Sequence, residues 1–213
     1  MRVLKSILDI LITPVCPICE NNFSSGICCD SCFLDLANDF NDYNRTRSLG
    51  ITKAISVFVY SDRVKKLIEY YKYEGFLKIG RFFSELLSHK ILAKRELFKE
   101  KSIIVPIPTS KARIRERGFD HTEYLAKEVS RITGVEYKKL LSSEYRPSQT
   151  KVKDRFENSK NRFFGISLSE YREYQIILLD DVITSGSTML SAINVLSNLG
   201  YNDIVCLSVA MKI

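Results

Sequence analysis

The feature that most constrains the fold of this 213-residue chain is an alternation of short apolar segments with segments of helical periodicity after Thr52. Strands that alternate with helices need crossover connections, which place the strands parallel in a sheet covered on both faces. We therefore predict an α/β fold with an open parallel sheet and helices on both faces. The expected strands are 54–60, 102–105, 175–179 and 204–209, and the expected helices are 64–73, 79–91, 121–133 and 188–199.

Five of the six cysteines lie close together near the N-terminus. Cys16 with Cys19 and Cys29 with Cys32 form two C-x-x-C pairs separated by nine residues. Four thiolates in this spacing can hold one structural Zn²⁺ in a tetrahedral site, and metal binding would supply the folding energy that so short a segment lacks. Redox disulfide chemistry is the alternative. Cys28 could replace Cys29 as a ligand, although only Cys29 keeps the two-residue spacing.

The cysteine segment is expected to be part of a separate N-terminal unit. Residues 1–13 carry a short apolar stripe interrupted by Asp9, with no small-residue cleavage site behind it, so we expect a docking helix. The Asn- and Asp-rich stretch 38–44 is typical of a linker. Residues 1–44 would then hold the helix, the zinc module and the linker, and residues 45–213 the main domain. No apolar run approaches the ~18 residues of a membrane span, so we expect a cytoplasmic protein without a transmembrane segment.

The formal net charge of +7 is concentrated in the middle of the chain. Residues 101–162 contain 15 basic and 8 acidic side chains, so the rest of the chain is neutral. Such a segment suits a phosphate-bearing partner, and a solvated basic face is the alternative. The stretch 145–162 lacks apolar periodicity, and we expect a long loop there.

Several enzyme classes are excluded by the sequence itself. No two glycines lie two residues apart, so the dinucleotide fingerprint is absent. No glycine precedes a lysine, which excludes a P-loop. His89 and His121 are the only histidines, too few for a histidine-rich metal centre, and no G-x-S-x-G elbow is present.

The most informative stretch is residues 176–188, where an apolar strand ends in two acids and a hydroxyl-rich turn leads into a helix. Backbone N–H groups and the positive end of a helix meet at such a turn, which suits a phosphate. Adjacent carboxylates would repel that phosphate unless they accept hydrogen bonds from sugar hydroxyls or hold a divalent cation. The implied ligand is a sugar phosphate, and a plain helix cap is the alternative.

This string resembles the phosphoribosyl pyrophosphate (PRPP) signature of type I phosphoribosyltransferases. The resemblance implies that the two acids bind the ribose hydroxyls, that the turn surrounds the 5-phosphate, and that Mg²⁺ accompanies the ligand. Purine salvage enzymes of that family have an Asp general base where this chain has Thr184, so purine bases are disfavoured acceptors. The implied PRPP-binding residues are Asp180, Asp181, Val182, Ile183, Thr184, Ser185, Gly186, Ser187 and Thr188.

A narrower resemblance, to the ComF competence proteins, extends over nearly the whole chain. It rests on the two C-x-x-C pairs, on a V-P-I-P segment at 105–108 followed by an R-x-R-G-F run at 115–119, and on a Q-T-K segment at 149–151 with a later R-x-x-N at 155–158. The resemblance places a pyrophosphate-side loop and a mobile basic loop beside the ligand. The implied pyrophosphate- or DNA-binding residues are Arg113, Arg115, Arg117, Lys151, Lys153 and Arg155.

The ComF resemblance implies a protein of natural transformation that binds PRPP with Mg²⁺ and single-stranded DNA. It would act with the DNA-uptake machinery on the cytoplasmic side of the inner membrane, peripheral to that membrane. Aromatic side chains near the basic segment could stack on bases. Two alternatives stay open: an active phosphoribosyltransferase for a small nucleobase or amine, and a non-catalytic PRPP sensor.

Overall fold

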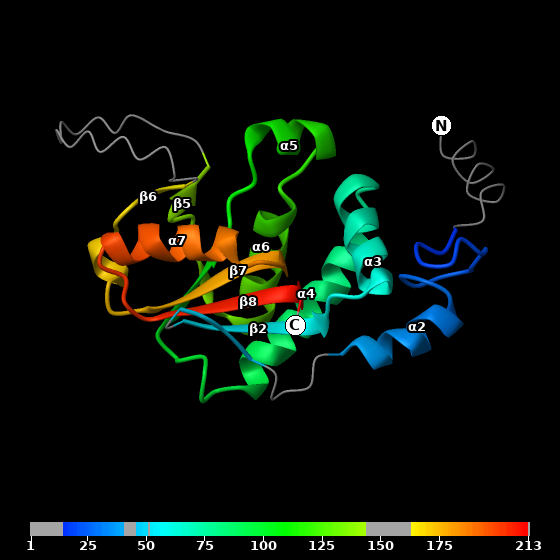
Figure 1. Ribbon diagram of the computed structural model, residues 1–213, viewed down its shortest axis with the longest axis horizontal. Helices are drawn as coiled ribbons and strands as arrows, with labels where there is room; N and C mark the ends of the chain where they lie inside the picture. Colours follow the sequence, from blue (N-terminus) through cyan, green and yellow to red (C-terminus); the bar gives the residue numbers. More distant parts are fainter. Residues whose placement is uncertain (1–14, 41–45, 51, 144–162, 213) are drawn as a thin grey trace.

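The computed structural model describes residues 15–40, 46–50, 52–143 and 163–212. Its centre is a mostly parallel sheet of six strands flanked by helices (Figure 1). The strand order is β1 (Arg47–Leu49), β2 (Thr52–Val59), β8 (Ile204–Met211), β7 (Gln175–Ile183), β3 (Ser102–Pro106) and β4 (Glu136–Tyr137). The predicted α/β class with an open parallel sheet is confirmed, with one correction. The edge strand β1 runs antiparallel to β2.

Both faces of the sheet are apolar and covered. Alternate residues of β7 belong to two different cores, with Ile177 and Leu179 in one and Ile176 and Leu178 in the other. The first core lies under α3 (Asp62–Tyr73), α4 (Leu77–Ala93) and α6 (His121–Thr133), and the second lies under α7 (Ser187–Asn198). These four helices and the four long strands overlap the predicted segments, because the helices carry an apolar periodicity and the strands are continuous apolar runs. The predicted strand 175–179 is longer than expected, since β7 extends to Ile183 and includes the acid pair.

Several short elements of the main body were not predicted, β1 and β4 among them. The helix α5 (Lys111–Arg117) has no buried residue, so it carries no apolar stripe that could indicate a helix. Its ends are nevertheless defined, since the Ser110 hydroxyl accepts from the Arg113 N–H and Gly118 closes the helix in a left-handed conformation. A small antiparallel pair, β5 (Leu141–Ser142) with β6 (Phe164–Gly165), borders the stretch that was expected to be a long loop.

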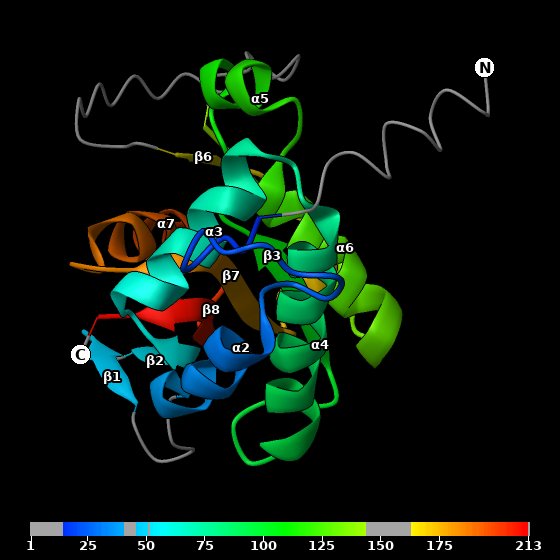
Figure 2. The ribbon, with the colours of Figure 1, turned by 90° about the vertical axis from the view of Figure 1, so that its right-hand side faces the viewer.

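The cysteine segment packs on the first core and is not isolated from it. Its helix α2 (Asp30–Leu36) lies beside α3 and α4 in Figure 2, and the Phe33 and Phe82 rings lie 6.0 Å apart between α2 and α4. Cys16, Ile18 and Leu36 belong to the same apolar cluster as residues of the sheet. The predicted helix at 1–13 lies outside the described residues, and the division at residues 44 and 45 stays a prediction.

No helix in the described parts of the chain combines the length and the apolar composition that a membrane span requires.

Candidate functional site

The strand connections identify one end of the sheet as the place for a ligand. From β3 the chain passes through α6 on one face of the sheet to β4, and from the neighbouring β7 it passes through α7 on the other face to β8. The two connections diverge between β3 and β7, and the carboxyl ends of strands at such a point are the usual ligand position in open α/β sheets. The predicted acid pair, Asp180 and Asp181, lies at that end of β7.

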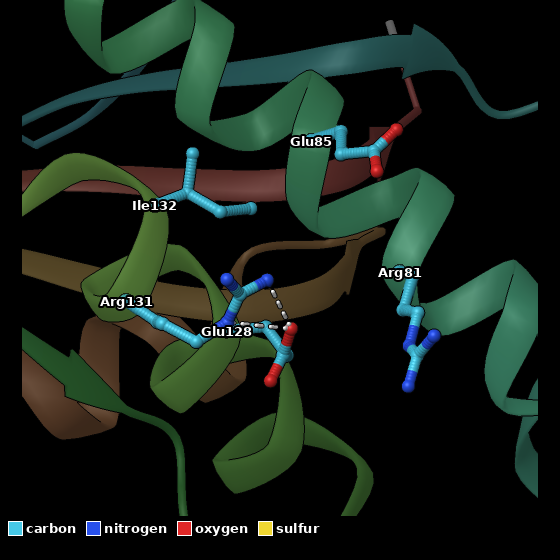
Figure 3. Close-up of a pocket in the computed structure, with 5 residues that line it drawn as sticks. All are labelled: Arg81, Glu85, Glu128, Arg131 and Ile132. Carbon is cyan, nitrogen blue, oxygen red and sulfur yellow. Dashed lines mark hydrogen bonds and ion pairs between the residues drawn. The ribbon is translucent and has the colours of Figure 1, made fainter.

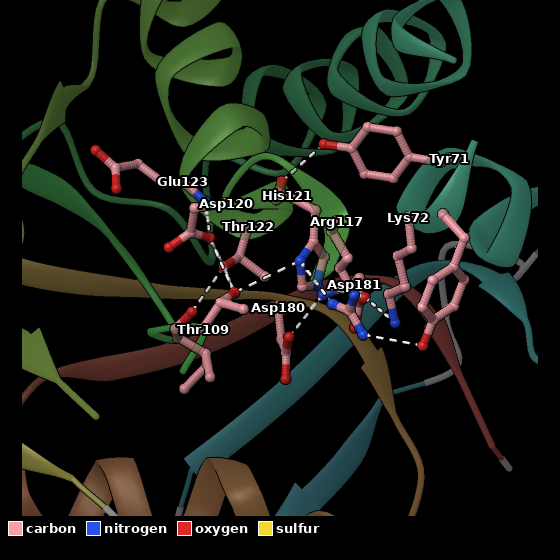
Figure 4. A network of polar contacts seen from close by, with 12 residues as sticks. Tyr71, Lys72, Thr109, Arg117, Asp120, His121, Thr122, Glu123, Asp180 and Asp181 are labelled. Atoms are coloured by element: carbon pink, nitrogen blue, oxygen red, sulfur yellow. Dashed lines mark hydrogen bonds and ion pairs between the residues drawn. The ribbon is translucent and has the colours of Figure 1, made fainter. Parts of the chain in front are cut away.

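Asp181 is buried but ion-paired. Its Oδ2 atom lies 2.9 Å from His121 Nε2 and forms an ion pair with Lys72 of α3 (Figure 4). Burial alone would raise the pKa of Asp181, yet His121 and Lys72 outweigh burial and hold that pKa well below its ordinary value. The carboxylate is therefore charged before any ligand arrives.

The neighbouring carboxyl has the opposite tendency. Burial, and then the negative charge of Asp181, raise the pKa of Asp180 well above its ordinary value. Its Oδ1 atom accepts a hydrogen bond from the Asp181 backbone N–H at 2.8 Å. The two adjacent acids thus have pKa values shifted in opposite directions, and a cation or a set of hydroxyl donors placed between them would favour ionisation of both.

The hydroxyl-rich turn at 184–188 leads directly into α7. The side chains of Thr184, Ser185 and Ser187 are exposed, and the Ser185 hydroxyl donates to the Ser187 hydroxyl at 3.0 Å. Gly186 is the N-cap residue of α7 and has no side chain to occupy the first N–H groups of the helix. The Ser187 N–H at the start of the helix donates to the Ser185 hydroxyl at 3.3 Å, and binding of a phosphate at this turn stays a prediction.

The edge strand β1 braces this turn. Arg47 donates hydrogen bonds from Nη1 to the Thr184 carbonyl at 2.5 Å and from Nη2 to the Ser185 carbonyl at 3.1 Å. Leu49, two residues further, packs so closely on Gly186 that a Cβ there would lie 2.5 Å from Leu49 Cδ2. The antiparallel edge strand therefore fixes the shape of the turn.

We expect Gly186→Ala to lower the free energy of unfolding by about 1–3 kcal/mol, measured by urea denaturation. The alanine would adopt φ near +83° and would contact Leu49. Gly134→Ala is the matched control, since Gly134 has φ +75° but open space around it. Gly134→Ala should lower the free energy of unfolding by less than Gly186→Ala does. Equal losses in the two variants would show that Leu49 moves aside and does not brace the turn.

The three predicted arginines of α5 divide into two kinds. Arg113 and Arg115 are exposed, whereas Arg117 turns inward. Arg117 Nη1 lies 3.0 Å from His121 Nδ1, its Nη2 donates to the Tyr73 hydroxyl at 3.2 Å, and its guanidinium carbon lies 4.9 Å from the centre of the Tyr73 ring. The structure thus brings Arg117 to the acid pair through His121. The other predicted basic residues, Lys151, Lys153 and Arg155, lie outside the described residues.

The helix α3 connects this site with the cysteine segment. Near its start, Lys66 donates to the Ile18 carbonyl at 2.7 Å, and Arg63 Nε pairs with Asp39 at 2.9 Å. At its end, Lys72 reaches Asp181 and the Tyr71 hydroxyl donates to the His121 carbonyl at 2.7 Å. One short helix therefore contacts the cysteine segment at one end and the acid pair at the other.

The four predicted cysteines, Cys16, Cys19, Cys29 and Cys32, come together in space. All four sulfur atoms lie within 4.8 Å of one another, and the Cys19 and Cys29 sulfurs lie 3.6 Å apart. Zinc–sulfur bonds of about 2.3 Å in a tetrahedron would put the sulfurs about 3.8 Å apart, so the cluster can hold a metal and is compatible with Zn²⁺. Cys28 is not part of this cluster, and burial first of all raises the pKa of its thiol to about 12.

A surface cavity of about 340 Å³ lies elsewhere, between α4 and α6 (Figure 3). Arg131 pairs there with Glu128 at 3.0 Å, and the charges of the cavity cancel. None of the site residues predicted from the sequence lines this cavity. The lining residues are Arg81, Glu85, Glu128, Arg131 and Ile132.

Comparison with curated proteins identifies relatives of this chain. Competence protein F of Haemophilus influenzae is 29% identical over 159 residues, which are 71% of this chain and 69% of that protein. The competence proteins ComFC of Streptococcus pneumoniae and Bacillus subtilis are 28% and 27% identical over 70% and 82% of this chain, and the matches span 64% and 68% of their lengths. The chain is a homologue of the ComF and ComFC competence proteins.

Other comparisons add less. No family model matches the chain. Among solved structures, the adenine phosphoribosyl transferase of Trypanosoma brucei, in complex with AMP, pyrophosphate and ribose-5-phosphate, is similar with a TM-score of 0.37 and 12% identity. The similarity covers 65% of this chain and 66% of that structure.

The sequence did not predict three residues of the site: Lys72, His121 and Arg47. Lys72 lies in the last turn of a helix whose pattern indicates only packing, and His121 is one of two histidines in the chain. Arg47 lies on a three-residue strand. Only the position of His121 next to the R-x-R-G-F run gave a signal that could have been followed.

Proposed function

We propose that this protein supports natural transformation by binding PRPP with Mg²⁺ and single-stranded DNA on the cytoplasmic side of the membrane. The role in competence is supported by three homologues that are named competence proteins. The observation that carries the PRPP part is the meeting of three features at one end of the sheet. These are the acid pair and Arg117 of α5, which Figure 4 shows, and the exposed turn before α7.

Each feature of the site has a place on this ligand. The N–H groups and hydroxyls of the turn would donate to the 5-phosphate, which the N-terminus of α7 also favours. Asp180 and Asp181 would accept from the ribose hydroxyls. Arg117 would face the pyrophosphate, since among the described residues its buried Nε donor has no hydrogen-bond partner.

The acid pair also fits the expected cation. Mg²⁺ prefers oxygen ligands and is usually held by substrate phosphates together with one or two carboxylates. Asp180 and Asp181 offer only carboxylate oxygens, and both are buried at the strand end. Bound Mg²⁺ would neutralise charge on the pyrophosphate oxygens.

The DNA part of the proposal rests on the exposed side of α5. Arg113 and Arg115 are exposed, and within the described residues neither contacts the acid pair, His121 or Lys72; α5 has no buried residue. Their charges belong to the segment that holds the whole surplus of the chain. Exposed arginines on a short projecting helix suit a sugar-phosphate backbone, and Arg117 stays available for the small ligand.

We expect binding of a labelled single-stranded oligonucleotide to weaken steeply with salt in a fluorescence anisotropy titration. Each phosphate contact adds about 0.7 to the slope of log affinity against log salt. Arg113→Ala with Arg115→Ala should therefore reduce the slope by about 1.4 if both side chains bind phosphates. A triple alanine variant of Lys151, Lys153 and Arg155 tests the basic loop in the same way.

The matched control removes two exposed arginines from outside the basic segment. Arg81→Ala with Arg95→Ala changes the net charge by the same amount and should leave the salt slope unchanged. If the salt slope of both the α5 variant and the loop variant equals that of the wild type, the basic segment is a solvated face. The proposal would then keep its PRPP part and lose its DNA part.

An active phosphoribosyltransferase is the second candidate, since the acid pair and the turn are what such an enzyme needs for PRPP. Thr184 takes the position of the purine-type general base, so an acceptor that must lose a proton would need another group. Release of pyrophosphate from PRPP in the presence of a nucleobase or an amine would favour this candidate. A protein that binds PRPP without any release is a sensor.

A further inference from the structure

The side chain of His121 lies between two groups of the site that belong to different elements. His121 is the first residue of α6, and its side chain is 7% exposed. Its Nε2 atom lies 2.9 Å from Asp181 of β7, and its Nδ1 atom lies 3.0 Å from Nη1 of Arg117 in α5 (Figure 4). The imidazole is thus the link between the pyrophosphate-side helix and the acid pair.

The two partners fix where the imidazole proton lies. A guanidinium has only donors, so Nδ1 must accept from Arg117 and carries no hydrogen. The Asp181 carboxylate has only acceptors and its Oδ2 atom lies 2.9 Å from Nε2, so Nε2 must carry the hydrogen. His121 is therefore held as the neutral Nε2–H tautomer, with each ring nitrogen in one role.

We propose that His121 is a positioning residue that holds Arg117 in register with Asp181 through this neutral bridge. The inference rests on the proposed function, because it is PRPP that would contact Arg117 at its pyrophosphate and Asp181 at its ribose. The backbone of His121 is fixed by Tyr71, whose hydroxyl donates to the His121 carbonyl at 2.7 Å. Its neighbour Asp120 caps α6 and also accepts from Thr109 at 2.9 Å.

The neutral bridge makes a specific demand on the side chain at position 121. A replacement must offer one donor and one acceptor, as the amide of glutamine does. His121→Gln should retain PRPP affinity within about threefold, whereas His121→Ala should lose about tenfold or more, because it leaves Arg117 and Asp181 without their shared partner. His89→Ala is the control, since His89 is exposed on α4 and should not matter.

The tautomer can be tested without any ligand. In protein labelled with ¹⁵N-histidine only His89 and His121 give imidazole signals, and the His121→Gln variant assigns them. We expect long-range ¹H–¹⁵N spectra near neutral pH to show the Nε2–H form for His121. An imidazolium, or the Nδ1–H form, would overturn the bridge.

The two measurements separate failure of this inference from failure of the proposed function. If the wild-type protein does not bind PRPP in isothermal titration, the proposed function fails, and the spectra still decide whether the bridge exists. If the wild type binds PRPP and His121→Ala binds equally well, the positioning role is wrong and the proposed function stands. Loss in His121→Ala with rescue in His121→Gln supports both.

Discussion

Replacing Asp181 with asparagine is expected to lower the affinity for PRPP with Mg²⁺ by about ten- to hundredfold, measured by isothermal titration. The substitution keeps the shape of the side chain but removes the carboxylate whose pKa His121 and Lys72 hold below its ordinary value. It also releases Lys72 and His121, which both contact Asp181. The amide could accept one hydrogen bond from the ribose but could not support the cation.

The control for this variant is Asp203→Asn. Asp203 pairs with Lys99 at 2.6 Å and lies just before β8, at the opposite end of the sheet from Asp181. Asp203→Asn likewise replaces one carboxylate by an amide of the same shape, and it should leave the affinity for PRPP unchanged. Circular dichroism should show that both variants are folded. Unchanged affinity in Asp181→Asn would mean that the turn binds another ligand, or is only a helix cap.

One zinc ion per chain is expected by elemental analysis, and its loss should destabilise more than the cysteine segment. Structural Zn²⁺ contributes about 10–16 kcal/mol to the folding of small zinc peptides. Here the segment shares its core with the sheet, since Cys16 and Leu36 pack in the cluster that contains Phe58. Cys16→Ser with Cys29→Ser should therefore abolish zinc binding and lower the melting temperature of the whole protein.

Cys28→Ala provides the matched comparison for the zinc variants. Cys28 is adjacent to Cys29 and buried, but its sulfur is not part of the four-cysteine cluster. The variant should keep one zinc per chain, with a smaller loss of stability from its packing alone. Full zinc retention in the double serine variant would contradict the assignment of the ligands.

The sequence predicted those parts of the molecule whose signals are local. The four long strands are continuous apolar runs, the four main helices carry an apolar period, and the two cysteine pairs have the spacing of a metal site. The acid pair lies in the last part of β7, and the turn follows that strand directly along the chain. In contrast, β1 has three residues and α5 has no buried face, so neither has a period that could indicate it.

The partners of the acids could not be predicted for a different reason. Lys72, His121 and Asp181 lie on α3, α6 and β7, and they meet only because the sheet order puts β7 beside β3. Contacts between residues so far apart in the chain depend on topology, which no local pattern encodes. The tautomer of His121 depends in turn on two such contacts.

The contacts at both ends of α3 affect how truncated fragments of this protein behave. A fragment beginning at residue 45 would leave Lys66 without the Ile18 carbonyl and would expose the apolar surface on which Leu36 packs. The same helix carries Lys72 to Asp181, so truncation would disturb the ligand site from a distance. Loss of binding in such a fragment would then be no evidence that the cysteine segment touches the ligand. Metal content has to be measured in every preparation whose affinities are compared.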